Sequence, residues 1–184
     1  TQRNGSVHEQ SENAVTRRLL IVGAGGFGRE VLQWAQDVAA QRGDWQIGGF
    51  LDADAAALDS YECTCRIIDT PAHYAPSADD LLICAIGDPA TRLRVAADLS
   101  SRGAEFATLV HPTAIVGSRC TLGAGTIICP RVTITTDVRL GQHVIVNTHS
   151  TIGHDVSIGE GCSLFSHCDV TGGARLEPGV TMGS

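Results

Sequence analysis

The hydrophobic positions between residues 116 and 182 repeat every six residues. Each sixth position is apolar without a gap, and the position four residues later is small or β-branched. This period fits neither an α-helix nor ordinary strand alternation. Three hexads make one triangular coil of 18 residues with aliphatic side chains stacked inside, so the pattern predicts a solenoid. The apolar positions are Val116, Leu122, Ile128, Ile134, Leu140, Val146, Ile152, Ile158, Leu164, Val170, Leu176 and Met182.

A different pattern occupies the first half of the chain. A short apolar strand at 19–22 leads into the glycine-rich stretch 23–28, and we expect a helix at 29–41. This is G-x-G-x-x-G between a strand and a helix, where backbone amides at a helix N-terminus receive a phosphate or pyrophosphate. A second strand at 46–51 ends at Asp52, near where a dinucleotide-binding fold places the acid that binds a ribose hydroxyl.

Only half of a dinucleotide-binding fold fits before the hexads begin. Further strands are expected at 66–68, 81–86 and 106–109, with a second helix at 89–102. One βαβαβ unit favours a nucleotide-linked sugar over a complete nicotinamide dinucleotide. The alternative, that the glycine turn only packs the helix closely on the sheet, stays open.

These patterns divide the chain into three parts. Residues 1–17 are polar and aperiodic and are expected to be a disordered tail. Residues 18–109 form the expected nucleotide-sugar-binding domain, and residues 110–184 form the solenoid. The sequence stops in mid-hexad without a capping element, so we expect either a truncated solenoid or a partner that covers its end.

Composition excludes several classes of function. The net charge is −7 and the 13 Lys and Arg residues are scattered, which argues against a nucleic-acid partner. No apolar run approaches a membrane span and no signal segment opens the chain, so a cytoplasmic protein is expected. The seven cysteines are expected to be reduced, and no second pair stands near Cys63 and Cys65 to complete a zinc site. We therefore expect no metal.

The regular hexads resemble the left-handed parallel β-helix of the hexapeptide acyltransferases. Within them, the run 146–155 (VNTHSTIGHD), together with the front domain, resembles the bacterial sugar O- and N-acyltransferases. These include sialic acid O-acetyltransferases and acetyl-CoA-dependent enzymes that N-acetylate nucleotide-linked 4-amino sugars. The resemblance implies a small Rossmann-like N-terminal domain followed by a left-handed parallel β-helix. It also implies a homotrimer, with acetyl-CoA in the groove between neighbouring β-helices and the nucleotide sugar held by the front domain.

The same resemblance implies a set of substrate-binding residues. One departure is Phe27, because some amino-sugar enzymes carry a His at this place in the glycine loop. The implied substrate-binding residues are Gly23, Gly25, Gly28, Asp52, Gly87, Asp88 and Asn147.

His154 is the candidate general base. It occupies an outward position of its hexad, next to Asp155. Acyl transfer from a thioester to an amine or hydroxyl needs a base for the nucleophile's proton, and His titrates near the working pH. Asp155 can fix the tautomer of the ring and stabilise the imidazolium. In the family that the chain resembles, a His followed by an acid carries this role.

Coil arithmetic adds the candidate oxyanion site. One coil of 18 residues after His154 lies Gly172, followed by Gly173, so bare backbone is expected beside the base. A glycine lets a thioester approach closely, and a main-chain amide of Gly172 can receive the developing oxyanion. Gly172 and Gly173 are accordingly the expected contacts of acetyl-CoA, with direct attack in a ternary complex. The alternative is that both glycines only form a corner.

Several other functions stay open. His149 and His154 have the spacing of zinc ligands in γ-type carbonic anhydrases, but the place of the third His is taken by Thr113. A nicotinamide-dependent reductase lacks its second half-site. A non-catalytic, nucleotide-sensing trimeric scaffold is the third alternative. The preferred hypothesis is an acetyltransferase acting on the amino group of a nucleotide-linked 4-amino sugar, with O-acetylation of sialic acid or another sugar as its nearest rival.

Overall fold

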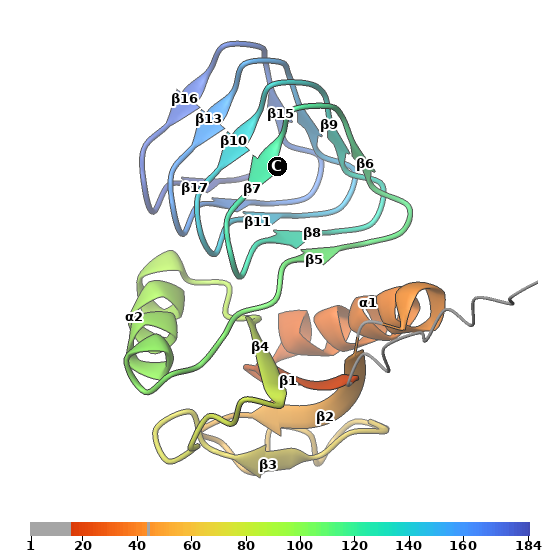
Figure 1. Cartoon of the computed structure of the whole chain (residues 1–184), viewed down its shortest axis with the longest axis vertical. Helices are drawn as coiled ribbons and strands as arrows, with labels where there is room; N and C mark the ends of the chain where they lie inside the picture. The colour runs from red at the N-terminus through yellow and green to blue at the C-terminus, as the bar shows by residue number, and fades with distance from the viewer. Residues whose placement is uncertain (1–15, 44) are drawn as a thin grey trace, which may run out of the picture.

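The structure is a computed structural model that describes residues 16–43 and 45–184. It contains a front domain, from β1 to α2, and a β-helix, from β5 to β17 (Figure 1). Residues 1–15 of the expected tail lie outside the described residues. Arg17, which the sequence assigned to that tail, is instead the first residue of β1 because it pairs in parallel with Trp45.

The front domain is a four-stranded parallel sheet between two helices. The strand order is β3-β2-β1-β4. The helices α1 and α2 lie on opposite sides of the sheet (Figure 1). Helix α1 begins three residues earlier than predicted, with Gly25 as its N-cap. The bounds are β1 Arg17–Val22, α1 Gly26–Arg42, β2 Trp45–Leu51, β3 Ile67–Asp69, β4 Asp80–Cys84 and α2 Pro89–Ser101.

The strand predicted at 106–109 is wrong as an element of this sheet. Phe106 makes only an isolated bridge to Leu82. Leu109 instead donates its N–H to the carbonyl of Thr126, and Leu109–Val110 becomes β5 of the β-helix. The six-residue repeat therefore begins before residue 116, and Leu109–Val110 belongs to the β-helix and not to the front sheet.

The β-helix consists of triangular coils whose two-residue strands stack into three parallel sheets. Strands one coil apart pair in register at a spacing of 18 residues, as in Ile145 with Ile127. The expected fold class, a small Rossmann-like domain followed by a parallel β-helix, is confirmed. One sheet contains β5 Leu109–Val110, β8 Ile127–Ile128, β11 Ile145–Val146, β14 Ser163–Leu164 and β17 Thr181–Met182; the second contains β6 Ile115–Val116, β9 Thr133–Ile134, β12 Thr151–Ile152 and β15 Asp169–Val170; the third contains β7 Thr121–Leu122, β10 Arg139–Leu140, β13 Ser157–Ile158 and β16 Arg175–Leu176.

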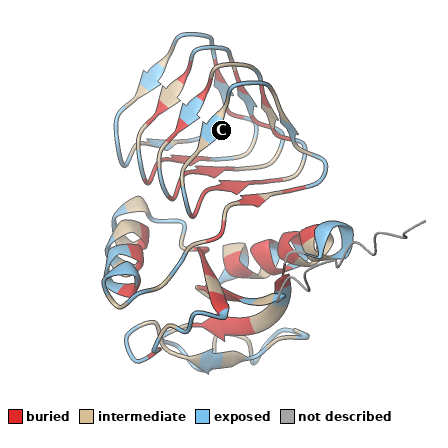
Figure 2. Ribbon diagram, viewed as in Figure 1, coloured by how far each residue is buried: buried red, intermediate tan, exposed pale blue. Residues whose placement is uncertain are grey.

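The front domain covers the first of these sheets. In each two-residue strand of the β-helix, the second residue points into the coil, whereas the first points outward. The outward residues Ile127, Ile145 and Ser163 are nevertheless buried, while Arg139 and Thr151 on the other two sheets are exposed (Figure 2). The hydrophobic core on the α1 side of the front sheet is continuous with the core of the β-helix.

Arg92 of α2 joins the two parts. Its side chain is fully buried. The guanidinium donates to the carbonyls of Ile86 and Gly87 within the front domain, at 2.6 and 2.9 Å. It also reaches the β-helix, where it donates to His143 O, Gly161 O and Ser163 Oγ at 3.0, 2.6 and 2.9 Å. This network fixes the height of the front domain along the β-helix.

Candidate active site

His154 and Asp155 lie in the turn between β12 and β13. Their side chains are exposed, at 68% and 65% of the accessible area. His154 Nδ1 is 2.7 Å from Asp155 Oδ2. With the Nδ1 proton directed to the carboxylate, Nε2 is the nitrogen free to accept a proton. The Asp155 N–H donates to the carbonyl of Thr136 one coil earlier, which anchors the turn.

A second charged pair lies on the same corner, one and two coils before the His154 turn. Arg119 donates twice to the carboxylate of Asp137, at 2.6 and 2.7 Å. The guanidinium holds the pKa of Asp137 at about 2, below its ordinary value. Asp137 is therefore charged at neutral pH, and its carboxylate is paired with Arg119.

Gly172 lies against the His154 ring, where the 18-residue spacing places it. A Cβ at position 172 would come within 2.6 Å of His154 Nε2. The carbonyl of His154 accepts a hydrogen bond from the Gly173 N–H at 2.7 Å. The Gly172 N–H, by contrast, makes no backbone hydrogen bond with any described residue. The absence of a side chain at position 172 thus leaves room for the imidazole ring and keeps a main-chain N–H next to the candidate base.

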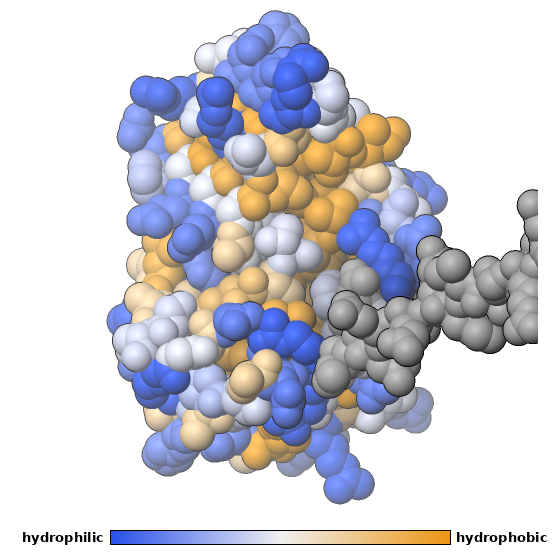
Figure 3. Space-filling model, viewed as in Figure 1, coloured by the Kyte–Doolittle hydropathy of each residue, from blue (hydrophilic) through white to orange (hydrophobic). Residues whose placement is uncertain are grey.

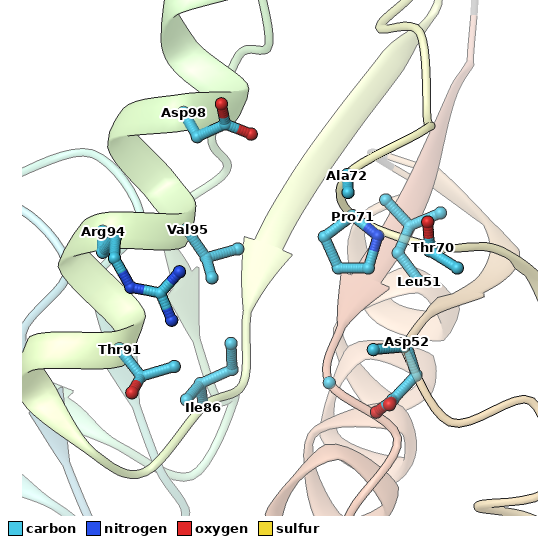
Figure 4. Close-up of a pocket in the computed structure, with 12 residues that line it drawn as sticks. Leu51, Asp52, Thr70, Pro71, Ala72, Ile86, Thr91, Arg94, Val95 and Asp98 are labelled. Carbon is cyan, nitrogen blue, oxygen red and sulfur yellow. The ribbon is translucent and has the colours of Figure 1, made fainter.

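A pocket of about 600 Å³ lies in the front domain at the carboxyl ends of the strands. Gly23 and Asp52 line it, together with Thr70 and Pro71 on the opposite side from α2 (Figure 4). Ligands of open α/β sheets bind at this edge. The residues contributed by α2, which the sequence prediction missed, are Thr91, Arg94, Val95 and Asp98. Their spacing on one face of the helix was the signal that could have identified them.

The three glycines of the G-x-G-x-x-G loop have different structural roles. Gly23 has φ +100°, a conformation that favours glycine, and lines the pocket. Gly25 is exposed at the N-terminus of α1. Gly28 is buried, and a Cβ there would meet the carbonyl oxygen of Gly23 at 1.9 Å. The open alternative from the sequence, a glycine that packs the helix closely, therefore describes Gly28. A Cβ at Gly23 would meet Ala85 O at 3.1 Å, whereas one at Gly25 would meet no atom within 4 Å.

Asp52 and Asp88 are both engaged with the backbone. Asp52 accepts the N–H of Ala24 in the glycine loop at 2.6 Å and that of Asp54 at 2.9 Å. Asp88 is the N-cap of α2 and accepts the Thr91 N–H at 2.8 Å, which lowers the pKa of its carboxyl group. Asp52 borders the pocket, whereas Asp88 shapes the turn that follows Gly87.

A second pocket, about 290 Å³, lies where the glycine loop meets the β-helix. Gly26, Phe27 and Gly87 line it from the front domain. Asn147 and Phe165 line it from the β-helix, just beyond β11 and β14. Sequence reasoning identified Gly87 and Asn147 but missed Glu30, Ile145, Ser163 and Phe165, which also line it.

The structure does not bring all the predicted site residues of one chain together. The second pocket lies on the sheet of β11 and β14, which faces the front domain. His154 and Gly172 lie on the corner between the other two sheets. In a triangular coil that corner is opposite the covered sheet (Figure 1).

The described residues offer neither a cluster of metal ligands nor a membrane-spanning helix. Across residues 16–43 and 45–184, no group of three or more His, Cys, Asp or Glu side chains is placed to hold a metal ion, which gives the zinc alternative no ligand set there. None of the helices in that part of the chain is long and apolar enough to cross a bilayer.

Residues 18–99 match the PglD N-terminal domain family. The UDP-N-acetylbacillosamine N-acetyltransferase of Bacillus subtilis (strain 168) is 27% identical over 116 residues, which are 61% of this chain and 51% of that relative. The chain thus spans about half the length of the curated relative that it matches.

Solved structures share the fold. WeeI from Acinetobacter baumannii AYE has a TM-score of 0.75 at 20% identity, over 88% of this chain and 76% of WeeI. PerB from Caulobacter crescentus, in complex with CoA and GDP-perosamine, has a TM-score of 0.73 at 21% identity, over 90% and 86%. The acetyltransferase domain of PglB from Neisseria gonorrhoeae FA1090, in complex with acetyl coenzyme A, has a TM-score of 0.61 at 19% identity, over 92% and 97%.

The match of the front domain and the curated relative indicate the same class of protein, the sugar N-acyltransferases. The resemblance of the chain to the sugar N-acyltransferase family, indicated by its sequence, is confirmed.

Proposed function

We propose that this chain is an acetyl-CoA-dependent acetyltransferase that acts on the amino group of a nucleotide-linked 4-amino sugar. The observation that carries the proposal is the His154–Asp155 pair beside the bare backbone of Gly172. The match of residues 18–99 to the PglD N-terminal domain family and the curated N-acetyltransferase relative support the sugar substrate.

The proposed chemistry follows from the geometry of the pair. The amine nitrogen of the sugar attacks the thioester carbonyl carbon of acetyl-CoA while His154 Nε2 takes a proton from the amine. Asp155 holds the Nδ1 proton and stabilises the imidazolium. The Gly172 N–H donates to the carbonyl oxygen as it gains negative charge. The carbon–sulfur bond then breaks, and the imidazolium returns the proton to the CoA thiolate.

The acceptor would extend across the two pockets. The pocket of Gly23 and Asp52 is the proposed place of the nucleotide, and the pocket of Gly87 and Asn147 is that of the sugar. Between them, the exposed N-terminus of α1 at Gly25 offers backbone amides to the diphosphate. Asp52 would contribute mainly by holding the glycine loop in this conformation.

A second copy of the chain is needed to complete this site. His154 lies on the corner opposite the sheet that carries the sugar pocket, so one copy cannot supply both. A homotrimer in which the His154 corner of one copy faces the pocket of the next satisfies the geometry, with acetyl-CoA in the groove between them. The β-helix exposes apolar surface that such contacts would cover (Figure 3). Ile115 and Phe165 are 64% and 45% exposed there.

The test is release of CoA thiol from acetyl-CoA with a panel of UDP- and GDP-linked amino sugars and free sialic acids. One amino sugar should support turnover. His154→Ala should lower kcat by at least about a hundredfold, because general-base catalysis contributes roughly that much. His73→Ala, which removes an exposed His of the front domain, is the matched control and should leave kcat unchanged. Equal turnover by His154→Ala and the wild type would contradict the assignment of the base.

A further inference from the structure

A column of basic side chains follows one corner of the β-helix. Arg131, His149 and His167 occupy equivalent turn positions in three successive coils. The rings of His149 and His167 are stacked, with centroids 5.0 Å apart and planes at 14°. Arg131 Nη1 lies 3.5 Å from His149 Nε2. We call these three exposed residues the basic stripe.

Hydroxyl groups run beside the basic stripe. Thr148 and Ser166, each one residue before a His of the stripe, have their hydroxyl oxygens 3.0 Å apart. Guanidinium, imidazole and hydroxyl groups are the side chains that most often donate hydrogen bonds to phosphate oxygens. The corner therefore presents a continuous row of donors that suits a phosphate or diphosphate.

No acid neutralises this row. Within residues 16–43 and 45–184, none of the three stripe residues forms a salt bridge. Asp169, the nearest acid along the chain after His167, accepts a hydrogen bond from Thr151. In a chain with a net charge of −7, an Arg without an acidic partner among the described residues, at the end of a pair of stacked imidazoles, is a local exception that favours anionic ligands.

The backbone at the stripe is strained. Arg131, His149 and His167 have φ values of +59°, +60° and +61°, a region that is costly for residues with a Cβ. The same turn conformation occurs on the other corners, at Arg119, Asp137 and Asp155 beside His154 and at His143 on the corner that faces α2. The positive φ is thus a general property of the coil turns and is not specific to the basic stripe.

The stripe also adjoins the proposed acceptor site. Asn147 and Phe165 line the second pocket, and each precedes a His of the stripe by two residues. A ligand that extends out of this pocket past Asn147 and Phe165 would therefore contact the basic stripe.

We infer that the basic stripe binds the phosphate groups of a diphosphate-bearing substrate as it enters the site between copies. This inference rests on the proposed function, which involves two such molecules, acetyl-CoA and the nucleotide sugar. The shared chemistry is the diphosphate, and the experiment separates the two sources.

The experiment compares the wild-type chain with the triple variant Arg131→Gln, His149→Gln, His167→Gln by isothermal titration calorimetry. The ligands are CoA, pantetheine, UDP, GDP and inorganic pyrophosphate. The triple variant should bind at least one diphosphate ligand about tenfold or more weakly, since each charge-assisted hydrogen bond to phosphate contributes substantially. Arg175→Gln, which removes an exposed Arg of β16 on another sheet, is the matched control and should bind like the wild type. All variants should retain the circular dichroism spectrum of the wild type, because every replaced side chain is exposed.

The pattern of losses identifies the ligand. Weaker binding of CoA alone assigns the stripe to the donor, and weaker binding of UDP or GDP alone assigns it to the acceptor. Unchanged binding of every diphosphate ligand, or no binding by the wild type, overturns the inference. An equal loss for pantetheine, which has no diphosphate, also overturns it. Because the readout is binding, loss of turnover in His154→Ala bears on the proposed function alone.

Discussion

At position 172, a single hydrogen in place of a side chain leaves room for the imidazole of the candidate base. In Gly172→Ala the new Cβ would lie 2.6 Å from His154 Nε2, so the ring must turn away. Misplacing a catalytic group by about 1 Å can cost about a hundredfold in rate, and we expect a fall in kcat of that order. Steady-state kinetics with the acceptor that supports turnover measures it.

The control for this substitution is Gly183→Ala, where a Cβ would meet no atom within 4 Å. Its kcat should equal that of the wild type, and the thermal unfolding of both variants should be unchanged. If Gly172→Ala retained full kcat, neither the position of the ring nor the free N–H would matter for the reaction.

A second residue, His143, makes stability depend on pH. Burial, with a smaller contribution from Arg92, lowers the pKa of His143 to about 4 from its ordinary value of 6.5. Between these values the unfolded chain binds a proton that the folded chain does not, so stability falls as the pH drops from 6.5 towards 4. The expected loss is about 3 kcal/mol. Urea unfolding at a series of pH values measures it.

His143→Gln removes this titrating group and should flatten that part of the profile. His73→Gln replaces an exposed His and should keep the profile of the wild type. An unchanged slope in His143→Gln would mean that other groups cause the acid sensitivity.

At the scale of single residues, the sequence predicted those contacts that depend only on the 18-residue length of a coil. Gly172 could be placed beside His154 because one coil contains a fixed number of residues. Thr70 could not be assigned to the front pocket, since that requires knowing how the segment after β3 faces α2 across the sheet. The hydrogen bonds from the backbone to Asp52 could not be predicted from the sequence either, because they depend on the path of the loop.

Helix α2 depends on one of its own residues for its attachment to the β-helix. Arg92→Ala would leave the buried carbonyls of His143 and Gly161 without their donor. We expect a loss of about 3 kcal/mol in the free energy of unfolding, because hydrogen bonds to a charged group are replaced by unsatisfied buried acceptors. Urea unfolding measures the loss. Arg94→Ala, an exposed position on the same helix, should change stability by less than about 0.5 kcal/mol. Similar stability of the two variants would contradict the role of Arg92 as the junction.

For the elements, periodicity predicted the solenoid better than the boundary before it. Leu109 was assigned to the front sheet because a short apolar run is equally compatible with either partner, whereas Val110 was already placed in the solenoid. The covered face of the β-helix did leave a signal in the sequence. Ile127 and Ile145 are apolar at outward positions, where the other sheets have Arg139 and Thr151.

At the scale of the whole molecule, the separation of pocket and base leads to a test by complementation. Gly87→Trp should fill the sugar pocket without disturbing the fold, because a Cβ at this exposed glycine meets no atom within 4 Å. This variant keeps His154, whereas His154→Ala keeps the pocket. Each homotrimer should be inactive, for opposite reasons.

Co-expression of the two variants with different affinity tags would produce mixed trimers. If each site takes its pocket from one copy and His154 from the next, random mixing leaves about a quarter of the sites with both parts intact. Purification on both tags removes the homotrimers, so each remaining trimer has one intact site of three, and its turnover should recover to about a third of the wild-type value. Were both parts supplied by the same copy, every site would lack one of them and the mixture would stay inactive. Recovery thus distinguishes a site shared between copies from a rearrangement that brings the His154 corner to its own pocket.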